Sequence, residues 1–414
     1  MRTYSPGLLR RVFEWKGQLA QGNRAATKDF GGIEIAPFKN NSPAAVSISA
    51  DFEMAWGWRS RPGPECASKA ANEGRNVPSL LRALEEYRIP ITWATVGHLF
   101  LESCTRGNCG LAHADMPRPP RNERWDGDWY RHDPCANVNE APAWYAPDLI
   151  ATILSSSVGH ELASHSFSHI DFSVTTSTPE LVRMEISACI KAMDPFGIRP
   201  RSLVFCHNRM GYQYSDLLYE MGIIVVRHRD SRSRLAYPER TASGLYKLYE
   251  SMNLRLATYY NYVDKAKIFI DEAIRRGDAY HMWFHPSDEP NVFEEAFIPI
   301  LDHIDSQRGK GLVWVSTMAD LAAYCEAREK TTISAIRSQS GMTLTLESSL
   351  DTSKFGNPYL TLLIPLDRPV TKIVYDQDND SQDSTAARRT HPVENERLIL
   401  NVPCKTKRVQ LFFS

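Results

Sequence analysis

Short hydrophobic runs alternate with helical patterns through the middle of the chain, from about residue 44 to residue 328. Apolar residues recur at intervals of three and four over 77–87, 178–197 and 261–277, as on one face of a helix. Seven runs have the length and composition of buried strands: 44–51 (AAVSISAD), 89–96, 159–165, 202–206, 223–228, 279–285 and 311–316. Strands that alternate with helices indicate βα units, and seven of them predict an α/β barrel with a parallel sheet.

The pattern changes after about residue 330 to a strict alternation of apolar and polar positions. The apolar positions are Met342, Leu344, Leu346, Leu360, Leu362, Ile364, Ile373, Tyr375, Leu398, Leu400, Val402, Val409, Leu411 and Phe413. A period of two between polar loops predicts a small antiparallel sandwich. We therefore expect an N-terminal helix and extension over 1–43, a barrel over 44–328 and an all-β domain over 329–414.

Residues 103–147 show neither periodicity and are rich in Pro, Trp and charge. A long loop of this kind inside a compact domain is usually functional, and we expect a lid or wall over a site. Cys104, Cys109, Cys135 and His113 within it have the residue types of a structural zinc site. The alternative is free thiols in a loop, which the loose C-x4-C spacing favours.

The charges nearly cancel, with 48 Lys and Arg against 49 Asp and Glu, so we expect no nucleic-acid partner. No apolar run approaches the roughly 18 residues that span a bilayer. The first residues lack the apolar run of an export signal, which predicts a cytoplasmic protein with reduced cysteines. Leu8, Leu9, Val12, Phe13 and Leu19 fall on one helical face, which would pack on the protein itself or, less favoured, touch a membrane surface.

Polar residues gather where the predicted strands end. Asp51 and Glu53 follow the first strand in SADFE, His165 and His169 follow the third in HSFSH, and His285 follows the sixth in WFHP. In an α/β barrel the carboxyl ends of the strands surround one cavity, so these side chains are expected to meet.

Two carboxylates and two imidazoles supply what hydrolysis by a metal-activated water requires. We expect Glu53, His165 and His169 to hold a divalent ion, most readily Zn²⁺, with Co²⁺ or Ni²⁺ as alternatives. Asp51 is then left to accept the proton of the water. His285 becomes the candidate acid for the leaving group.

The order of SADFE, HSFSH and WFHP on βα units resembles the polysaccharide deacetylase family, also called the NodB-homology family or carbohydrate esterase family 4. HSFSH fits the family pattern H-[ST]-x-x-H fully. The resemblance, over roughly residues 44–328, implies a distorted (β/α)7 barrel that removes acetyl groups from N-acetylated sugars with a divalent metal. It implies Asp51 as the base, Glu53, His165 and His169 as metal ligands, and His285 as the acid.

One segment departs from the family pattern. The family usually has an Arg-x-Pro motif whose arginine orients the base, whereas this chain reads FCHNRMGY with Gly211 where proline is usual. Arg209 is the first candidate for that role and His207 the second.

These observations favour a metal-dependent enzyme that hydrolyses an N-acetyl group on a carbohydrate, either an amino-sugar precursor or a surface polysaccharide. Two alternatives remain open at this stage. The same barrel could hydrolyse a cyclic or non-sugar amide, or the altered FCHNR segment could mark an inactive carbohydrate-binding relative.

Overall fold

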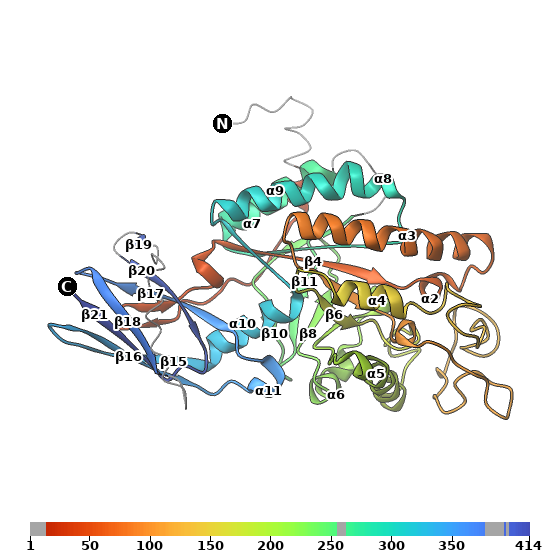
Figure 1. Ribbon diagram of the computed structural model, residues 1–414. Coiled ribbons are helices and arrows are strands. Elements are labelled where there is room, and N and C mark those ends of the chain that lie inside the picture. The colour runs from red at the N-terminus through yellow and green to blue at the C-terminus, as the bar shows by residue number, and fades with distance from the viewer. Residues whose placement is uncertain (1–13, 255–261, 377–392, 395–396) are drawn as a thin grey trace.

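The computed structural model describes residues 14–254, 262–376, 393–394 and 397–414 (Figure 1). The predicted helical face formed by Leu8, Leu9, Val12 and Phe13 lies outside these residues, whereas Leu19 is described and buried.

All seven predicted barrel strands are present and form one curled, mostly parallel sheet. The strand order is β10-β11-β8-β7-β6-β5-β4-β13-β12, with β14 also paired to β4. The bounds are β4 (Ala44–Phe52), β5 (Thr92–Thr95), β6 (Glu161–Ser164), β7 (Ser202–Val204), β8 (Val225–His228), β10 (Glu239–Arg240), β11 (Tyr246–Tyr249), β12 (Met252–Asn253), β13 (Ala279–Phe284) and β14 (Val313–Ser316). The predicted distorted barrel is therefore confirmed in the form of an open, curled sheet.

Strand β4 is the centre of this sheet, and each of its nine residues is buried. One edge of β4 pairs with β13 through residues 45–50. The other edge of β4 is divided between two strands. Residues 44–47 pair with β14 and residues 49–52 pair with β5. Because β14 and β5 share one edge of β4, the sheet opens between them instead of closing into a regular barrel.

Amphipathic helices cover the sheet, and in Figure 1 α3, α7 and α9 lie together on one side while α5 and α6 lie on the other. The bounds are α3 (Pro64–Glu86), α4 (Pro147–Leu154), α5 (Pro179–Met193), α6 (Ser215–Glu220), α7 (Tyr262–Arg276), α9 (Ile298–Gly309) and α10 (Met318–Lys330). The helix predicted from residue 77 begins earlier, at Pro64. The sequence suggested a later start because 64–76 is mostly polar and Pro78, which normally disfavours a helix interior, lies inside α3.

The C-terminal residues form two antiparallel sheets, as their alternating pattern predicted. The four-stranded sheet contains β15 (Thr331–Arg337), β16 (Gly341–Ser348), β21 (Arg408–Phe413) and β18 (Val370–Asp376). The five-stranded sheet contains β19 (Val393–Glu394), β20 (Arg397–Pro403), β17 (Tyr359–Pro365), β3 (Ile33–Ile35) and β2 (Asp29–Phe30). The pairing of the N-terminal β3 with β17 was not foreseen, because β2 and β3 are too short to show a period.

The insertion at 103–146 has no helix or extended strand and is held by isolated bridges such as Ser103 with Asn137. It nevertheless buries Trp129 and Tyr130 against the core of the barrel. None of the eight cysteines is in a disulfide.

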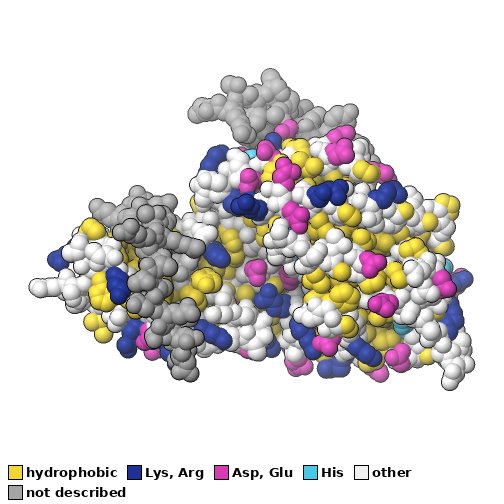
Figure 2. All heavy atoms as spheres, viewed as in Figure 1, with side chains coloured by type: hydrophobic (Ala, Val, Ile, Leu, Met, Phe, Trp, Pro, Cys, Tyr) yellow, Lys and Arg dark blue, Asp and Glu magenta, His cyan; other side chains and the backbone are white. Residues whose placement is uncertain are grey.

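The surface carries both signs of charge. In Figure 2 Lys and Arg side chains are interspersed with Asp and Glu on the visible face, in line with the balanced composition. In the described part of the chain, no helix combines the length and apolar character needed to cross a bilayer.

Candidate active site

The polar strand ends converge on a pocket of about 460 Å³. Its lining residues are Asp51, Glu53, Gly57, Trp58, Arg61, His169, His207, Asn208, Arg229, Trp283, His285 and Asp288. These residues come from the carboxyl ends of β4 and β13 and from the segments that follow β4, β6, β7, β8 and β13. The structure thus brings the predicted base, ligand and acid residues to one place.

Glu53, His165 and His169 form a compact buried group. The Nε2 atoms of His165 and His169 each lie 3.0 Å from Oε1 of Glu53. All three residues are at most 5% exposed. Asp51, Glu53 and His165 also present ligand atoms within 4.8 Å of one another.

The hydrogen bonding of His165 decides which ring nitrogen faces the group. Its Nδ1 donates to the carbonyl oxygen of Val204 at 2.8 Å, because a carbonyl can only accept. In the neutral ring, Nε2 then directs a lone pair at the Glu53 carboxylate. A buried carboxylate facing an imidazole lone pair is stabilised by a cation between them, so this donor set fits a divalent metal.

Two buried glutamates on helices hold the loops that carry the candidate ligands. Glu73 of α3 accepts from the backbone N–H groups of Glu53 and Met54, at 3.0 and 2.7 Å. Glu185 of α5 accepts from those of Phe167 and Ser168, at 2.9 and 2.8 Å. Sequence reasoning missed both glutamates, although a carboxylate on the apolar face of a helix is a signal that a buried donor faces it.

Gly57 in α2 (Ala55–Trp58) leaves the space that the Glu53 side chain occupies. A Cβ at this position would lie 1.8 Å from Oε2 of Glu53 and 2.8 Å from its Cβ. Any side chain at residue 57 must therefore displace the Glu53 carboxylate.

Asp51 is held by Arg227 of β8, which the sequence analysis did not identify. The Arg227 guanidinium donates to both carboxylate oxygens of Asp51, at 2.6 and 2.7 Å. Burial by itself raises the pKa of Asp51, but the charge and hydrogen bonds of Arg227 offset this and leave that pKa below its ordinary value. Asp51 is therefore ionised at neutral pH, in the form that can accept a proton.

The prediction that Arg209 contacts the base is wrong. Arg209 is 43% exposed and pairs with Glu123 at 3.3 Å and Asp171 at 3.7 Å. The change at Gly211 has a steric reason, since a Cβ there would lie 2.6 Å from the Cβ of Phe172. The arginine that reaches Asp51 comes instead from the next strand along the chain.

His207 and His285 line the same pocket as Glu53. His207 packs edge-on against His169, with ring centroids 4.5 Å apart, and burial lowers the pKa of its imidazole. His207 does not replace Arg227 as the partner of Asp51, because Arg227 occupies both oxygens of that carboxylate. Nε2 of His285 lies 3.8 Å from Oε1 of Glu53 and faces the same pocket.

The loops around the pocket contain several non-glycine residues with positive φ. Met54, Ser166, His169, His207 and Asn208 have φ between 49° and 57°. A non-glycine residue in this backbone conformation lowers the stability of the fold by about 1–3 kcal/mol, and such residues cluster at functional sites. Their concentration in the loops after β4, β6 and β7 supports the location of the site.

Comparisons with known proteins agree with this fold. Residues 70–207 match the family model of polysaccharide deacetylases. The match contains the HSFSH loop and His207, while Asp51, Glu53, Arg227 and His285 lie outside it and join them in space. The resemblance to polysaccharide deacetylases is therefore confirmed over residues 70–207.

Solved structures of other proteins resemble this chain at low sequence identity. A protein from Mycobacterium smegmatis assigned as a polysaccharide deacetylase is 16% identical, with a TM-score of 0.51, over 78% of this chain and 99% of that chain. A second such protein, from Pseudomonas aeruginosa PAO1, is 14% identical, with a TM-score of 0.48, over 69% and 92% of the two chains. The first likeness supports the NodB-type fold. No curated protein matches the sequence.

Proposed function

We propose that the protein is a hydrolase that removes an acyl group, first of all acetyl, from the nitrogen of an amino sugar with the help of a divalent metal. The observation that carries the proposal is the pairing of two carboxylates with different environments at one pocket. Glu53 faces two imidazole nitrogens, and Asp51 is fixed by Arg227. The family match over residues 70–207 supports a carbohydrate substrate.

Glu53, His165 and His169 are the residues that would hold the ion, and Zn²⁺ suits their oxygen and nitrogen donors. When bound, such an ion polarises an amide carbonyl and lowers the pKa of water. Three protein donors leave a coordination position free, as catalytic zinc sites require.

The remaining residues would handle the protons. Asp51 accepts the proton of the attacking water, and the two hydrogen bonds from Arg227 fix the direction of its carboxylate. His285 donates a proton to the nitrogen of the amide as its bond to the acyl carbon breaks. The products are a carboxylic acid and a free amine on the sugar.

The pocket also contains groups that would recognise the rest of the substrate. Trp58 lies beside His285, with ring centroids 6.2 Å apart, and the cations of Arg61 and Lys69 lie over its ring. Arg61 and Arg229 line the same pocket. Two arginines near the candidate base favour an amino sugar that carries an anionic group, such as a phosphate of an activated precursor.

The proposal is tested by measuring acetate release from N-acetylated monosaccharides, nucleotide sugars and short oligosaccharides. The protein is stripped of metal, assayed, and assayed again after addition of Zn²⁺ or Co²⁺. We expect release that depends on the metal and that is fastest with an anionic precursor. Absence of release from every substrate, with metal bound at Glu53, His165 and His169, would refute the proposal.

A further inference from the structure

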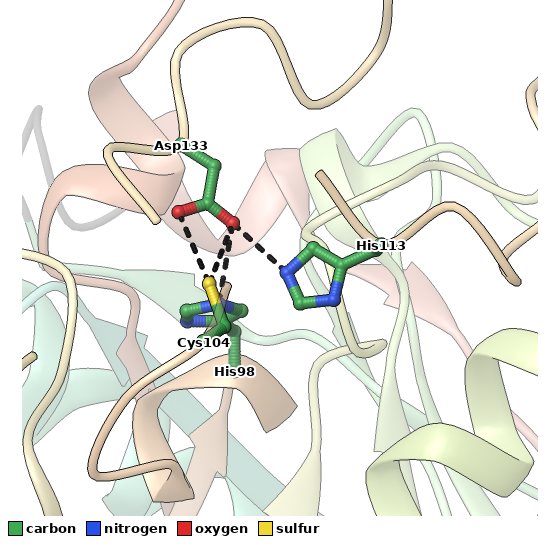
Figure 3. A group of neighbouring side chains, drawn as sticks. All are labelled: His98, Cys104, His113 and Asp133. Atoms are coloured by element: carbon green, nitrogen blue, oxygen red, sulfur yellow. Dashed lines mark hydrogen bonds and ion pairs between the residues drawn. The ribbon is translucent and has the colours of Figure 1, made fainter. Parts of the chain in front are cut away.

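A second group of ligand-type side chains lies beneath the insertion, apart from the pocket. His98 comes from the 3-10 helix η2 (Gly97–Phe100) after β5, whereas Cys104, His113 and Asp133 come from the insertion. Their ligand atoms all lie within 4.8 Å of one another. Figure 3 shows the Asp133 carboxylate facing the Cys104 sulfur and both imidazole rings.

The separations between these atoms are those of ligands around one ion. Oδ2 of Asp133 lies 2.9 Å from Nε2 of His113, 3.3 Å from Nε2 of His98 and 3.5 Å from Sγ of Cys104. Ligands bound to zinc at about 2.0–2.3 Å in a tetrahedron are about 3.3–3.8 Å from each other. The group therefore needs only small shifts to enclose an ion.

The charges and hydrogen bonds of the group are incomplete without a cation. The Asp133 side chain is fully buried, and among the described residues its ion pairs are with His98 and His113. Nδ1 of His98 faces the carbonyl oxygen of Trp144 at 3.3 Å and must donate to it. Nε2 of His98 is buried without a hydrogen-bond partner and directs its lone pair at the carboxylate.

We propose that His98, Cys104, His113 and Asp133 bind a structural zinc ion, separate from the ion of the pocket. Two imidazoles, one thiolate and one carboxylate give a four-coordinate site with no position left for water or substrate. Cys109, which the sequence pattern had included among the candidate ligands, is exposed and lies outside the group. A pocket of about 660 Å³ that Cys104 and His113 help to line offers the ion a path of entry.

The ion would fasten the insertion to the barrel and support the HSFSH loop. The ring of Phe167, in the HSFSH loop, packs against the second group, with its centroid 5.6 Å from that of His98 and 5.4 Å from that of His113. Close to the group, Nε1 of Trp129 donates to Oγ of Ser168 at 2.9 Å. Because the insertion has almost no secondary structure, a metal would supply the cross-link that backbone hydrogen bonds do not.

Metal analysis and cobalt spectroscopy of the full chain test this site without an activity assay. The pocket ligands proposed above are a carboxylate and imidazoles, so a thiolate-to-cobalt charge-transfer band in the Co²⁺ protein reports on the second site. We expect two ions per wild-type chain and such a band. The His165→Ala/His169→Ala variant should keep one ion and the band, which separates this inference from the proposed function.

The Cys104→Ser variant should lose the band, and Cys104→Ser/His113→Ala should also lose one ion. Two matched controls should keep the band: Cys109→Ser, at an exposed cysteine of the same insertion, and Cys206→Ser, at the cysteine nearest to His165. Absence of the band from the wild-type Co²⁺ protein overturns the proposal. This test does not depend on whether any variant folds. Its persistence in Cys104→Ser also overturns it.

Discussion

The described residues contain two groups of histidines and carboxylates, and the groups differ in where their residues come from. Glu53, His165 and His169 lie on loops that directly follow strands of one sheet, whereas three of the four residues in the second group lie in the insertion. The first group opens on a pocket that also holds Asp51 and His285. The second group has a fourth donor and no residue placed to move a proton to or from a substrate. Similar side chains thus suit reaction in one place and cross-linking in the other.

The largest effect on turnover is expected for Asp51→Asn. Loss of a general base typically costs about 10²–10⁴-fold in rate, and we expect kcat to fall by this factor. Both metal ions should remain, because Asp51 is not among the proposed ligands. Steady-state kinetics with metal analysis checks this, and Asp194→Asn at an exposed site should leave kcat unchanged. Near wild-type turnover in Asp51→Asn would show that another group is the base.

A methyl group added at residue 57 should weaken the ion site of the pocket and leave the second site unchanged. In Gly57→Ala the new Cβ displaces the Glu53 carboxylate, and a misplacement of this kind costs about 10²-fold in activity. The ion of the pocket should bind more weakly, while the thiolate-to-cobalt band stays. Gly74→Ala in α3 is the control, because nothing lies within 4 Å of its added Cβ. Equal activity of the two variants would contradict the described position of Glu53.

Arg227 and Arg209 can be compared through the same substitution. Arg227→Lys removes a two-point contact with Asp51, and loss of such a supporting contact costs about 10–100-fold in activity. Arg209→Lys should leave kcat unchanged, because Arg209 pairs with Glu123 and Asp171. Activity measurements on both variants would be decisive. A larger loss in Arg209→Lys would restore the role that the sequence first suggested.

The smallest effect on turnover, and the clearest on stability, is expected at Glu185. Its carboxylate accepts from two backbone N–H groups of the HSFSH loop and from the hydroxyl of Tyr130 in the insertion. Glu185→Ala leaves buried donors without acceptors, at a cost of about 1–3 kcal/mol in the free energy of unfolding. Urea unfolding measures this change. Glu180→Ala on the exposed start of α5 should cost less than about 1 kcal/mol, and equal losses in the two variants would argue against this role.

The fold and the position of the pocket were predictable because both depend on local patterns. Seven strands showed as short apolar runs, and Asp51, Glu53, His165, His169 and His285 lie at the end of one of them or in the loop that follows. The parallel sheet then brings these strand ends together without further information.

Contacts between distant segments were not predictable in the same way. Arg227 meets Asp51 across 176 residues, and no spacing marks the pair. A single arginine inside the apolar run IIVVRH does indicate that a buried partner exists, but not which one. His98 and Asp133 were missed for a related reason, since no spacing links the two residues and Asp133 lies in a loop without period. Cys104 and His113 were noticed because of their residue types.

The pairing of β3 with β17 affects how the chain is made. Ile35 is opposite Leu362, so the hairpin formed by β2 and β3 is translated more than 300 residues before its partner strand. Ile33 and Ile35, at 2% and 1% exposed in the folded protein, stay uncovered on the ribosome until the C-terminal sheet emerges. Contacts of such long sequence separation form late and slowly. The interval in which those two isoleucines need protection from aggregation is therefore set by the time that the ribosome takes to traverse the whole barrel.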